Sequence, residues 1–185
     1  MPHRVCPWWL GYLLLNPFRR IGQDPRQILA PYVKAGMTVL EPGPGMGFFT
    51  IELLRMVGCA GRVVAVDIQA KMVAKLKRRA AKAGLLDRLE ARLSSADSMG
   101  IADLRGSVDF ILAFAVVHEF PDTSRFFCEV AEVSKSGAKM LVAEPKGHVE
   151  TAEFEAEPGA ADEAGFKVVG RPAIRRSHAA LLRRM

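Results

Sequence analysis

Three regularly spaced glycines are the part of the chain whose residue types point most directly to chemistry. Gly43, Gly45 and Gly47 follow the apolar residues Val39 and Leu40, and a segment with the pattern of an amphipathic helix comes next. Glycine lacks a Cβ atom, so it adopts positive φ readily and lets the backbone approach a ligand closely. The helix that follows offers backbone N–H groups without partners inside the helix. The spacing therefore predicts a loop that binds a nucleotide-like ligand between a strand and a helix.

Two carboxylates near this loop indicate which ligand it takes. Glu41 precedes the first glycine by two positions, where it would face the anionic pyrophosphate of a dinucleotide at an electrostatic cost, and Phe48 stands where G-x-G-x-x-G needs its third glycine. S-adenosylmethionine has no phosphate and carries an ammonium and a sulfonium, so an acid is favourable there. About 20 residues beyond the loop, Asp67 ends a second apolar run, placed to accept hydrogen bonds from both ribose hydroxyls. The two signals favour S-adenosylmethionine over NAD.

The segment 41–47, Glu-Pro-Gly-Pro-Gly-Met-Gly, matches the E/D-x-G-x-G-x-G motif, and here the chain resembles the class I S-adenosylmethionine-dependent methyltransferases of small, single-domain type. The resemblance runs from about residue 25 to the end, and Asp67 matches the acid that closes the family's second strand. Later segments match the family's fourth and fifth strand motifs, the acid-x-Gly-Phe entry to the sixth strand, and the seventh strand, at 108–115, 138–145, 163–169 and about 172–184.

Apolar strand-like runs alternate with helical stretches, which predicts a doubly wound α/β fold. We expect a mostly parallel, seven-stranded sheet with helices on both faces, the Rossmann-like arrangement that the resemblance implies. The strand-like runs lie near residues 37–41, 62–67, 89–93, 108–114, 138–143 and 166–170. An amphipathic helix is expected from about 69 to 83. Pro158 and Gly159 break the helical composition of residues 147–162, which predicts one interrupted helix or two short ones.

The chain of 185 residues, half of them apolar, suits one compact domain without metals or disulfides, which we expect at 25–185. A segment at 1–24 precedes it and contains Trp8 and Trp9. This segment has three interpretations: a lid over cofactor and substrate, as in small members of the resembled family, a contact with a membrane surface, or packing against the sheet edge. Its apolar run is shorter than the ~20 residues of a membrane-spanning helix and lacks a cleavage site, so we expect no integral membrane segment and no signal peptide.

Charge and cysteine content suggest the partners. The net charge of +6 is spread along the sequence, and aromatic residues do not interleave with the basic ones, so the nucleic-acid signature is weak and a small-molecule acceptor is expected. Cys6, Cys59 and Cys128 show no C-x-x-C spacing, which favours reduced thiols in a cytoplasmic protein without a metal site. We expect a monomer or a homodimer.

The resemblance implies roles for several residues around the cofactor. Glu41, Gly43 and Gly45 would border its methionine part, and the implied cofactor-binding set as a whole is Glu41, Gly43, Pro44, Gly45, Asp67, Ile68, Ser95, Ala96, Asp97, Ala113, Phe114 and Ala115. The chain departs from the family after the third strand, because Ser95 falls on the position of the acid that holds the adenine amino group and Asp97 lies two residues later. Either could accept from that group, and Asp97 or Ser98 could equally cap a helix.

The exit of the fourth strand should open at the carboxyl ends of the strands, where ligands bind in open α/β sheets, and line the methyl-transfer pocket. It lacks the N/D-P-P-Y/F sequence of enzymes that methylate exocyclic amines of bases or glutamine. His118 could act as a general base, position a substrate hydroxyl or carboxylate, or make a structural hydrogen bond to the following loop. Glu119, Glu144, Trp8 and Trp9 are further candidates for substrate contacts.

These observations predict an enzyme that transfers a methyl group from S-adenosylmethionine to a small molecule and releases S-adenosylhomocysteine. Two other functions stay open. The chain could bind S-adenosylmethionine without turnover, or it could methylate RNA or protein.

Overall fold

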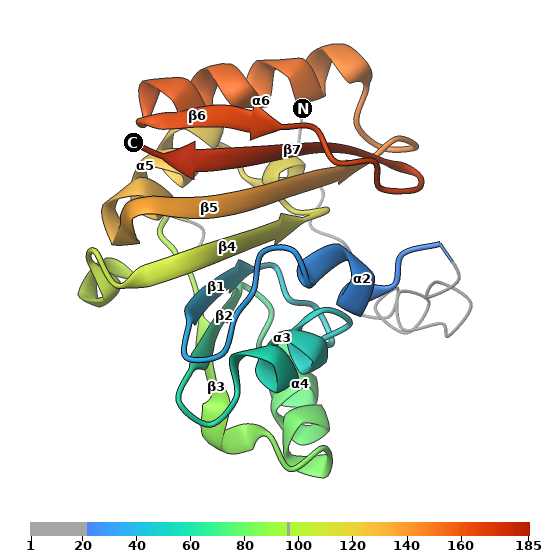
Figure 1. Ribbon diagram of the computed structural model, residues 1–185, viewed down its shortest axis with the longest axis vertical. Helices are drawn as coiled ribbons and strands as arrows, with labels where there is room; N and C mark the ends of the chain where they lie inside the picture. The colour runs from blue at the N-terminus through green and yellow to red at the C-terminus, as the bar shows by residue number, and fades with distance from the viewer. Residues whose placement is uncertain (1–21, 96) are drawn as a thin grey trace. The chain divides into compact units, whose positions relative to one another are not determined.

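The computed structural model describes residues 22–95 and 97–185. Residues 1–21, which include Trp8 and Trp9, and the single residue Ala96 lie outside this description. The described chain forms two compact parts that meet in sequence at residue 100 (Figure 1). We call residues 22–100 the first part and residues 101–185 the second part, and describe each by itself.

Three strands and their connecting helices make up the first part. In chain order they are α2 (Pro25–Leu29), β1 (Thr38–Pro42), α3 (Thr50–Val57), β2 (Arg62–Asp67), α4 (Ala70–Lys82), the 3-10 turn η3 (Leu86–Arg88) and β3 (Leu89–Leu93). The strands are parallel and lie in the order β3-β2-β1. Helix α3 packs on β1 and β2, and α4 packs on β2 and β3. All three strands therefore end at the same edge, as the predicted ligand loop requires.

The burial pattern of the first part follows from its sequence. Strand β2 buries every residue after Arg62, as expected of a parallel strand that is covered rather than exposed to water. Helix α4 turns its apolar stripe inward, with Met72 and Leu76 buried, and lies within one residue of its predicted ends. Gly84 follows the helix at a φ of 68°, a left-handed conformation that glycine adopts without strain and that ends many helices.

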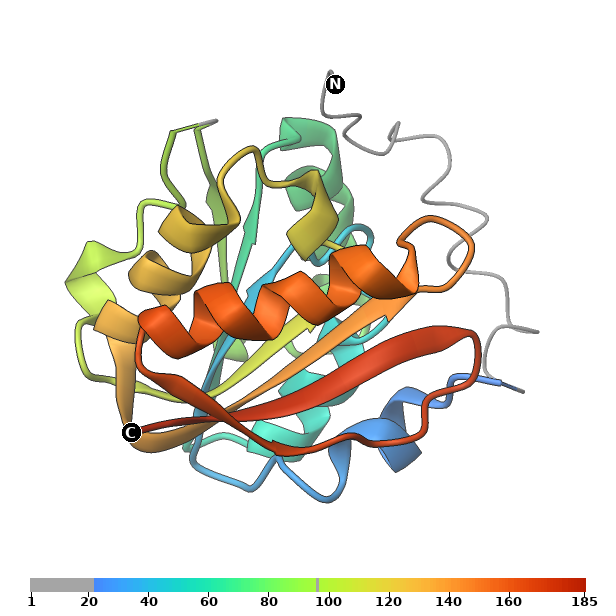
Figure 2. The same cartoon turned by 90° about the horizontal axis from the view of Figure 1, so that it is seen from above.

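The second part contains four strands, and one of them reverses direction. In chain order its elements are η4 (Ala102–Leu104), β4 (Val108–Phe114), η5 (Val117–Glu119), α5 (Thr123–Val133), β5 (Ser134–Pro145), α6 (Thr151–Glu163), β6 (Phe166–Gly170) and β7 (Ser177–Arg184). The strands lie in the order β4-β5-β7-β6. β4 and β5 are parallel, whereas β7 runs antiparallel to both of its neighbours. Helix α6 packs against α5, β6 and β7 (Figures 1 and 2).

Helix α6 corrects the expectation of an interrupted helix or two short ones. It runs without a break through Pro158, although proline lacks the N–H of a helical hydrogen bond. Its first turn is held by a capping box between Glu150 and Glu153. Phe154 and Ala161, on either side of the proline, are both buried. Packing on both sides thus offsets the missing hydrogen bond and keeps the helix continuous.

Two further observations concern the helices and the cysteines. No helix within the described ranges combines the length and the apolar character that a membrane crossing needs. Cys59 and Cys128 are exposed free thiols, one in each part.

Candidate functional site

The glycine loop joins β1 to α3 in the first part, and its glycines serve different purposes. All three have positive φ: 63° at Gly43, 54° at Gly45 and 84° at Gly47. A Cβ atom added at Gly45 would meet no other atom within 4 Å, whereas one at Gly47 would lie 2.5 Å from Leu76 Cδ1. Gly47 therefore lets the loop pack against α4. Gly45 instead leaves an open side that a ligand can approach.

Backbone hydrogen bonds hold this loop at the end of the sheet. Gly43 N donates to Val66 O at 2.9 Å, which ties the start of the loop to β2. Gly47 N donates to Pro44 O at 2.9 Å and closes a turn. The loop is thus positioned by the neighbouring strand as well as by its own.

Glu41, in β1, is a buried carboxyl group with an unused acceptor. The residue is 3% exposed, and its Oε2 atom has no hydrogen-bond partner among the described residues. Burial raises the pKa of Glu41 to about 8; the Thr50 side chain opposes this shift and the charge of Asp67 adds to it. A buried polar atom without a partner is costly, so a ligand that brings a cation or a donor to it gains affinity. The ammonium group of S-adenosylmethionine fits this requirement.

Asp67 closes β2 and connects the loop to the start of α4. Its Oδ1 atom accepts a hydrogen bond from Gln69 N at 2.8 Å, and its carboxyl group also interacts with the backbone N–H of Gly45. Burial raises the pKa of Asp67 to about 6, and these two backbone donors limit the rise. One side chain therefore holds the middle of the glycine loop beside the end of the second strand, where it was expected to meet the ribose.

Two large apolar side chains are exposed beside Asp67. Ile68 is 42% exposed, and Leu93, the register partner of Asp67 at the end of β3, is 60% exposed. Apolar side chains exposed at the carboxyl ends of neighbouring strands suit the flat face of an aromatic ring. Ile68 was expected to bind the cofactor, and Leu93 was not among the predicted residues. The sequence feature that could have identified Leu93 is its position as the apolar last residue of the third strand-like run, 89–93.

Three serines that follow β3 take part in hydrogen bonds. Ser94 N donates to Asp67 O at 3.0 Å, and the Ser95 hydroxyl accepts from Ser98 N at 3.1 Å. Ser98 Oγ in turn accepts from Gly100 N at 3.1 Å. Asp97 is exposed, and neither it nor Ser98 caps a helix, because the next helical turn begins at Ala102. Ser95 is thus engaged in a turn, and Asp97 is the more available acceptor.

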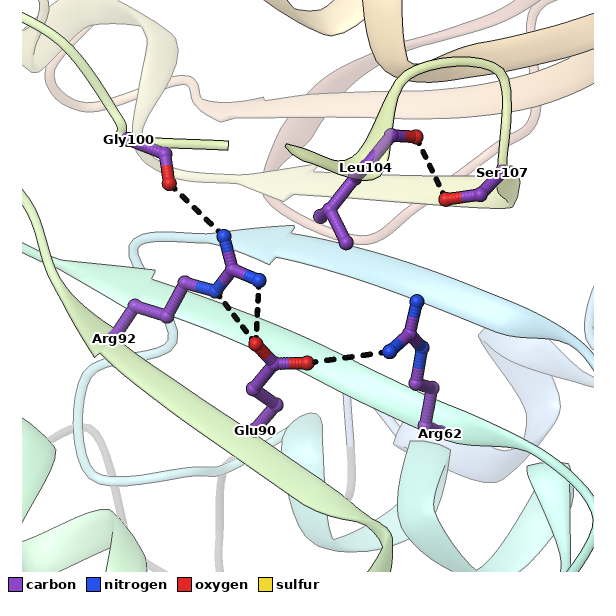
Figure 3. Close-up of polar contacts among 6 residues, drawn as sticks. All are labelled: Arg62, Glu90, Arg92, Gly100, Leu104 and Ser107. Atoms are coloured by element: carbon purple, nitrogen blue, oxygen red, sulfur yellow. Dashed lines mark hydrogen bonds and ion pairs between the residues drawn. The ribbon is translucent and has the colours of Figure 1, made fainter. Parts of the chain in front are cut away.

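An ion-pair chain fastens this loop to the strand before it (Figure 3). The Arg92 guanidinium donates to Gly100 O at 2.9 Å and to Glu90 Oε1 at 2.9 Å. The other oxygen of Glu90 pairs with Arg62 at 3.5 Å. Arg92, which we did not single out from the sequence, therefore joins both ends of the loop that carries Ser95 and Asp97.

In the second part, the exit of β4 turns sharply. Ala113 and Phe114 are buried, and Ala115 then adopts a φ of 55°, in the left-handed region that alanine enters at a cost. The Ala115 N–H donates to Ala143 O of β5 at 2.7 Å. The next two N–H groups, of Val116 and Val117, both donate to Glu144 Oε1, at 3.1 and 2.8 Å.

Glu144 also binds the candidate base. Its second oxygen, Oε2, pairs with Nδ1 of His118. Burial lowers the pKa of His118, but the hydrogen bond and charge of Glu144, with the charges of Glu119 and Glu153, outweigh it and raise the pKa above its usual value. Glu144 itself is 0% exposed with both oxygens engaged. Glu144, which we predicted as a substrate contact, thus directs both carboxylate oxygens to groups of the protein itself.

A second buried acid lies near this pair. Glu157 of α6 is 7% exposed, and its Oε2 atom lacks a hydrogen-bond partner among the described residues. Burial raises the pKa of Glu157 to about 8, and the charge of Glu144 contributes. The helical spacing of Glu157 with the buried residues Phe154 and Ala161 was a signal for its burial that sequence reasoning missed.

The predicted residues therefore gather in two groups. The first part brings together the glycine loop, Asp67 and Ile68, and the second brings together the β4 exit, His118 and Glu144. Within residues 22–95 and 97–185, no group of three or more His, Cys, Asp or Glu side chains could hold a metal ion.

Comparison with known proteins adds independent findings. Residues 33–167 match a family model described as "Methyltransferase domain". A ribosomal RNA small subunit methyltransferase A of Magnetococcus marinus is 32% identical over 71% of this chain, and an arsenite methyltransferase of Halobacterium salinarum is 30% identical over 64%. The chain spans 52% of the first relative and 29% of the second.

A crystal structure of a SAM-dependent methyltransferase from Aquifex aeolicus is also similar. It superposes with a TM-score of 0.84 at 27% identity, and the match covers 97% of this chain and 98% of the other. The expected fold class, a doubly wound α/β fold with a mostly parallel seven-stranded sheet, is thereby confirmed.

Proposed function

This chain belongs to the class I S-adenosylmethionine-dependent methyltransferase family, and from that membership we propose that it methylates a small-molecule acceptor and releases S-adenosylhomocysteine. The observation that carries the proposal is the buried Glu41, whose Oε2 atom has no partner among the described residues and lies in the strand that leads into the glycine loop. A cationic ligand is what such a carboxyl group favours.

In this proposal, residues of the first part would contact each portion of the cofactor. Glu41 would hold the ammonium group, and the open side of Gly45 would admit the methionine portion. Asp67 would accept the ribose hydroxyls. Ile68 and Leu93 would flank the adenine ring, with Asp97 as acceptor for its amino group.

The bound cofactor would supply an activated methyl group with a neutral thioether as its leaving group. The protein must then mainly align the acceptor and exclude water, and such alignment is worth roughly 7 to 11 kcal/mol in favourable cases. The residues of the β4 exit would serve the acceptor.

The class of acceptor is supported by sequence features. The chain lacks the N/D-P-P-Y/F motif of base and glutamine methylation, and its basic residues do not alternate with aromatic ones. The ribosomal RNA methyltransferase among the relatives makes RNA the rival acceptor. An acceptor screen must therefore contain both classes.

Calorimetry tests the cofactor. The purified protein is titrated with S-adenosylmethionine, S-adenosylhomocysteine and NAD, and micromolar binding of the first two without binding of NAD is expected. Binding of NAD alone would overturn the interpretation of the glycine loop.

An acceptor screen tests the reaction. Methyl-labelled cofactor is incubated with a panel of hydroxyl, amine and thiol compounds and, separately, with RNA. Label in a small molecule supports the proposal. Label in RNA alone would replace it, and cofactor binding without turnover across both panels would favour a binding module.

A further inference from the structure

In the second part, the Glu144 side chain binds the His118 ring and two backbone N–H groups at the same time. We propose that Glu144 is a positioning residue that holds Nδ1 of His118, so that Nε2 accepts a proton from a hydroxyl-bearing methyl acceptor. The inference rests on the proposed function and deepens it by naming the acceptor as a hydroxyl compound that must lose its proton.

Glu144 is fixed from several directions. It lies in β5, where its backbone pairs with His178 of β7, and its side chain is completely buried. Oε1 accepts the N–H groups of Val116 and Val117, which leaves Oε2 for the imidazole. Hydrogen bonds to an ionised carboxylate are among the stronger ones in proteins. The carboxylate therefore cannot turn away from the ring without releasing the loop.

This geometry selects one tautomer of His118. A carboxylate only accepts hydrogen bonds, so Nδ1 must carry the proton that joins the two groups. In the neutral ring the lone pair then lies on Nε2. No hydrogen bond from the described residues engages Nε2, and the side chain is 28% exposed. The ring thus offers a defined proton acceptor that a ligand can reach.

The backbone of the loop that carries His118 also contacts Glu144. The left-handed turn at Ala115 comes directly before the two valines that donate to Glu144. A strained residue persists where the surrounding contacts hold it, and such residues concentrate at functional sites. A plain structural hydrogen bond to the following loop, the other interpretation of His118, would not require Glu144 to hold both the loop and the ring.

The charges around the ring favour a base. Besides Glu144 from β5, Glu119 from η5 and Glu153 from α6 act on His118, and all three are acids. The charge of Glu144 also raises the pKa of Glu157, which lies on the same helix as Glu153. Imidazolium formed by proton uptake is therefore stabilised from three elements of the second part.

The proton and electron pairs balance in a simple way. The hydroxyl proton of the acceptor moves to His118 Nε2, and the oxygen electron pair left behind forms the new bond to the transferred methyl carbon. The electron pair of the broken carbon–sulfur bond stays on sulfur, which becomes a neutral thioether. An acceptor that attacks without losing a proton would not need His118.

The substitution Glu144→Gln tests the positioning role. The glutamine carbonyl can still accept from the two valines, but its amide donates to Nδ1, so the ring proton should move to Nε2. Long-range ¹⁵N–¹H spectra of protein labelled in its four histidines read the tautomer directly, with His118→Asn to assign the signal. We expect the Nδ1–H form in the wild type, the Nε2–H form in the variant, and a lower pKa of His118. Near-UV circular dichroism verifies that the variant is folded.

Glu153→Gln is the matched control. It removes one charge that acts on His118, and glutamine preserves the capping box of α6. A smaller fall in the pKa and an unchanged tautomer are expected. An Nε2–H ring in the wild type, or an Nδ1–H ring in a folded Glu144→Gln, would overturn the proposal.

Activity provides the second readout. With a hydroxyl acceptor from the screen, Glu144→Gln should lower kcat by about 100-fold or more, the usual scale of general-base catalysis, with unchanged cofactor affinity. Transfer to a hydroxyl compound at the wild-type rate would refute the role of the pair. The spectra need no cofactor, so a protein that fails to bind S-adenosylmethionine would refute the proposed function and leave the tautomer result standing.

Discussion

The charge of Asp67 raises the pKa of Glu41, so the two buried acids of the first part are coupled. Burial is the larger cause of the shift, which takes the pKa of Glu41 from 4.5 to about 8. The pKa of Asp67 is itself raised from 3.8 to about 6, again chiefly by burial. The glycine loop is therefore bordered by two carboxyl groups, and each is protonated more readily in the folded protein than in the unfolded chain.

This coupling predicts how stability depends on pH. A raised pKa means that the contribution of Glu41 is present below about pH 4.5 and is lost as the pH rises through about 8. Glu41→Gln cannot ionise, so its free energy of unfolding, relative to wild type, should be higher at pH 8 than at pH 5 by more than about 1 kcal/mol. Urea denaturation at the two pH values measures the difference. Asp87→Asn serves as the control, because the side chain of Asp87 is 67% exposed. If Glu41→Gln and wild type differed in unfolding free energy by the same amount at both pH values, the prediction would be contradicted.

Cofactor binding should release a proton. If the ammonium group of S-adenosylmethionine meets Glu41, the carboxyl group must ionise on binding, which at pH 7 releases about one proton. Calorimetry in two buffers with different ionisation enthalpies detects the release as a difference in apparent binding enthalpy. Glu41→Gln should abolish that difference and weaken binding. Equal enthalpies in both buffers for the wild type would place the ammonium group elsewhere.

Asp67→Ala should weaken S-adenosylmethionine binding by one to two orders of magnitude, or roughly 1.5 to 3 kcal/mol, because a hydrogen bond to a charged group is lost. Asp67→Asn is the informative companion, because its amide oxygen can still accept from Gln69 N while the carboxylate charge is removed. Calorimetry should rank wild type, asparagine and alanine in that order. Unchanged affinity in the alanine variant would remove Asp67 from the site.

Gly45→Val should abolish cofactor binding and leave the fold intact. Gly84 offers a matched control, because it has a similar φ, 68° against 54°, and a Cβ there would also meet no atom within 4 Å. Both valine variants should lose about 1 to 2 kcal/mol of stability through left-handed strain. Only Gly45→Val should lose binding. Wild-type affinity in that variant would show that the open side of the loop is not where the ligand lies.

Much of the first part could be predicted because local patterns determine it. The apolar run that ends in Asp67 coincides with β2, and α4 lies within one residue of its predicted ends. Both follow from side-chain periodicity and from glycines at the boundaries. The same reasoning singled out Ile68 but not Leu93, since the exposure of an apolar side chain at a strand end depends on what the neighbouring loop covers.

The second part was less predictable because its key contacts are distant in sequence. His118 and Glu144 are joined only once β5 pairs with β4 in a particular register, and no local pattern encodes that register. Helix α6 continues through Pro158 because buried side chains flank it, a tertiary effect that outweighs the local preference. Strand β5 likewise begins at Ser134, earlier than the expected start near residue 138. The hydroxyl of Ser134 donates to Val130 O at 2.7 Å.

The position of β7 has a consequence for how the chain could be divided. The strand is formed by residues 177–184, yet it lies between β5 and β6 rather than at a sheet edge. If the chain were divided within residues 171–176 and the piece that contains β7 were left out, the sheet of the second part would have a slot one strand wide. The backbone groups of β5 and β6 that pair with β7 would border this slot. A short synthetic peptide with the sequence of β7 has the hydrogen-bonding pattern and the alternation of side chains to refill that slot. The second part thus contains a natural site for a split version of the protein that is reassembled by adding its missing strand.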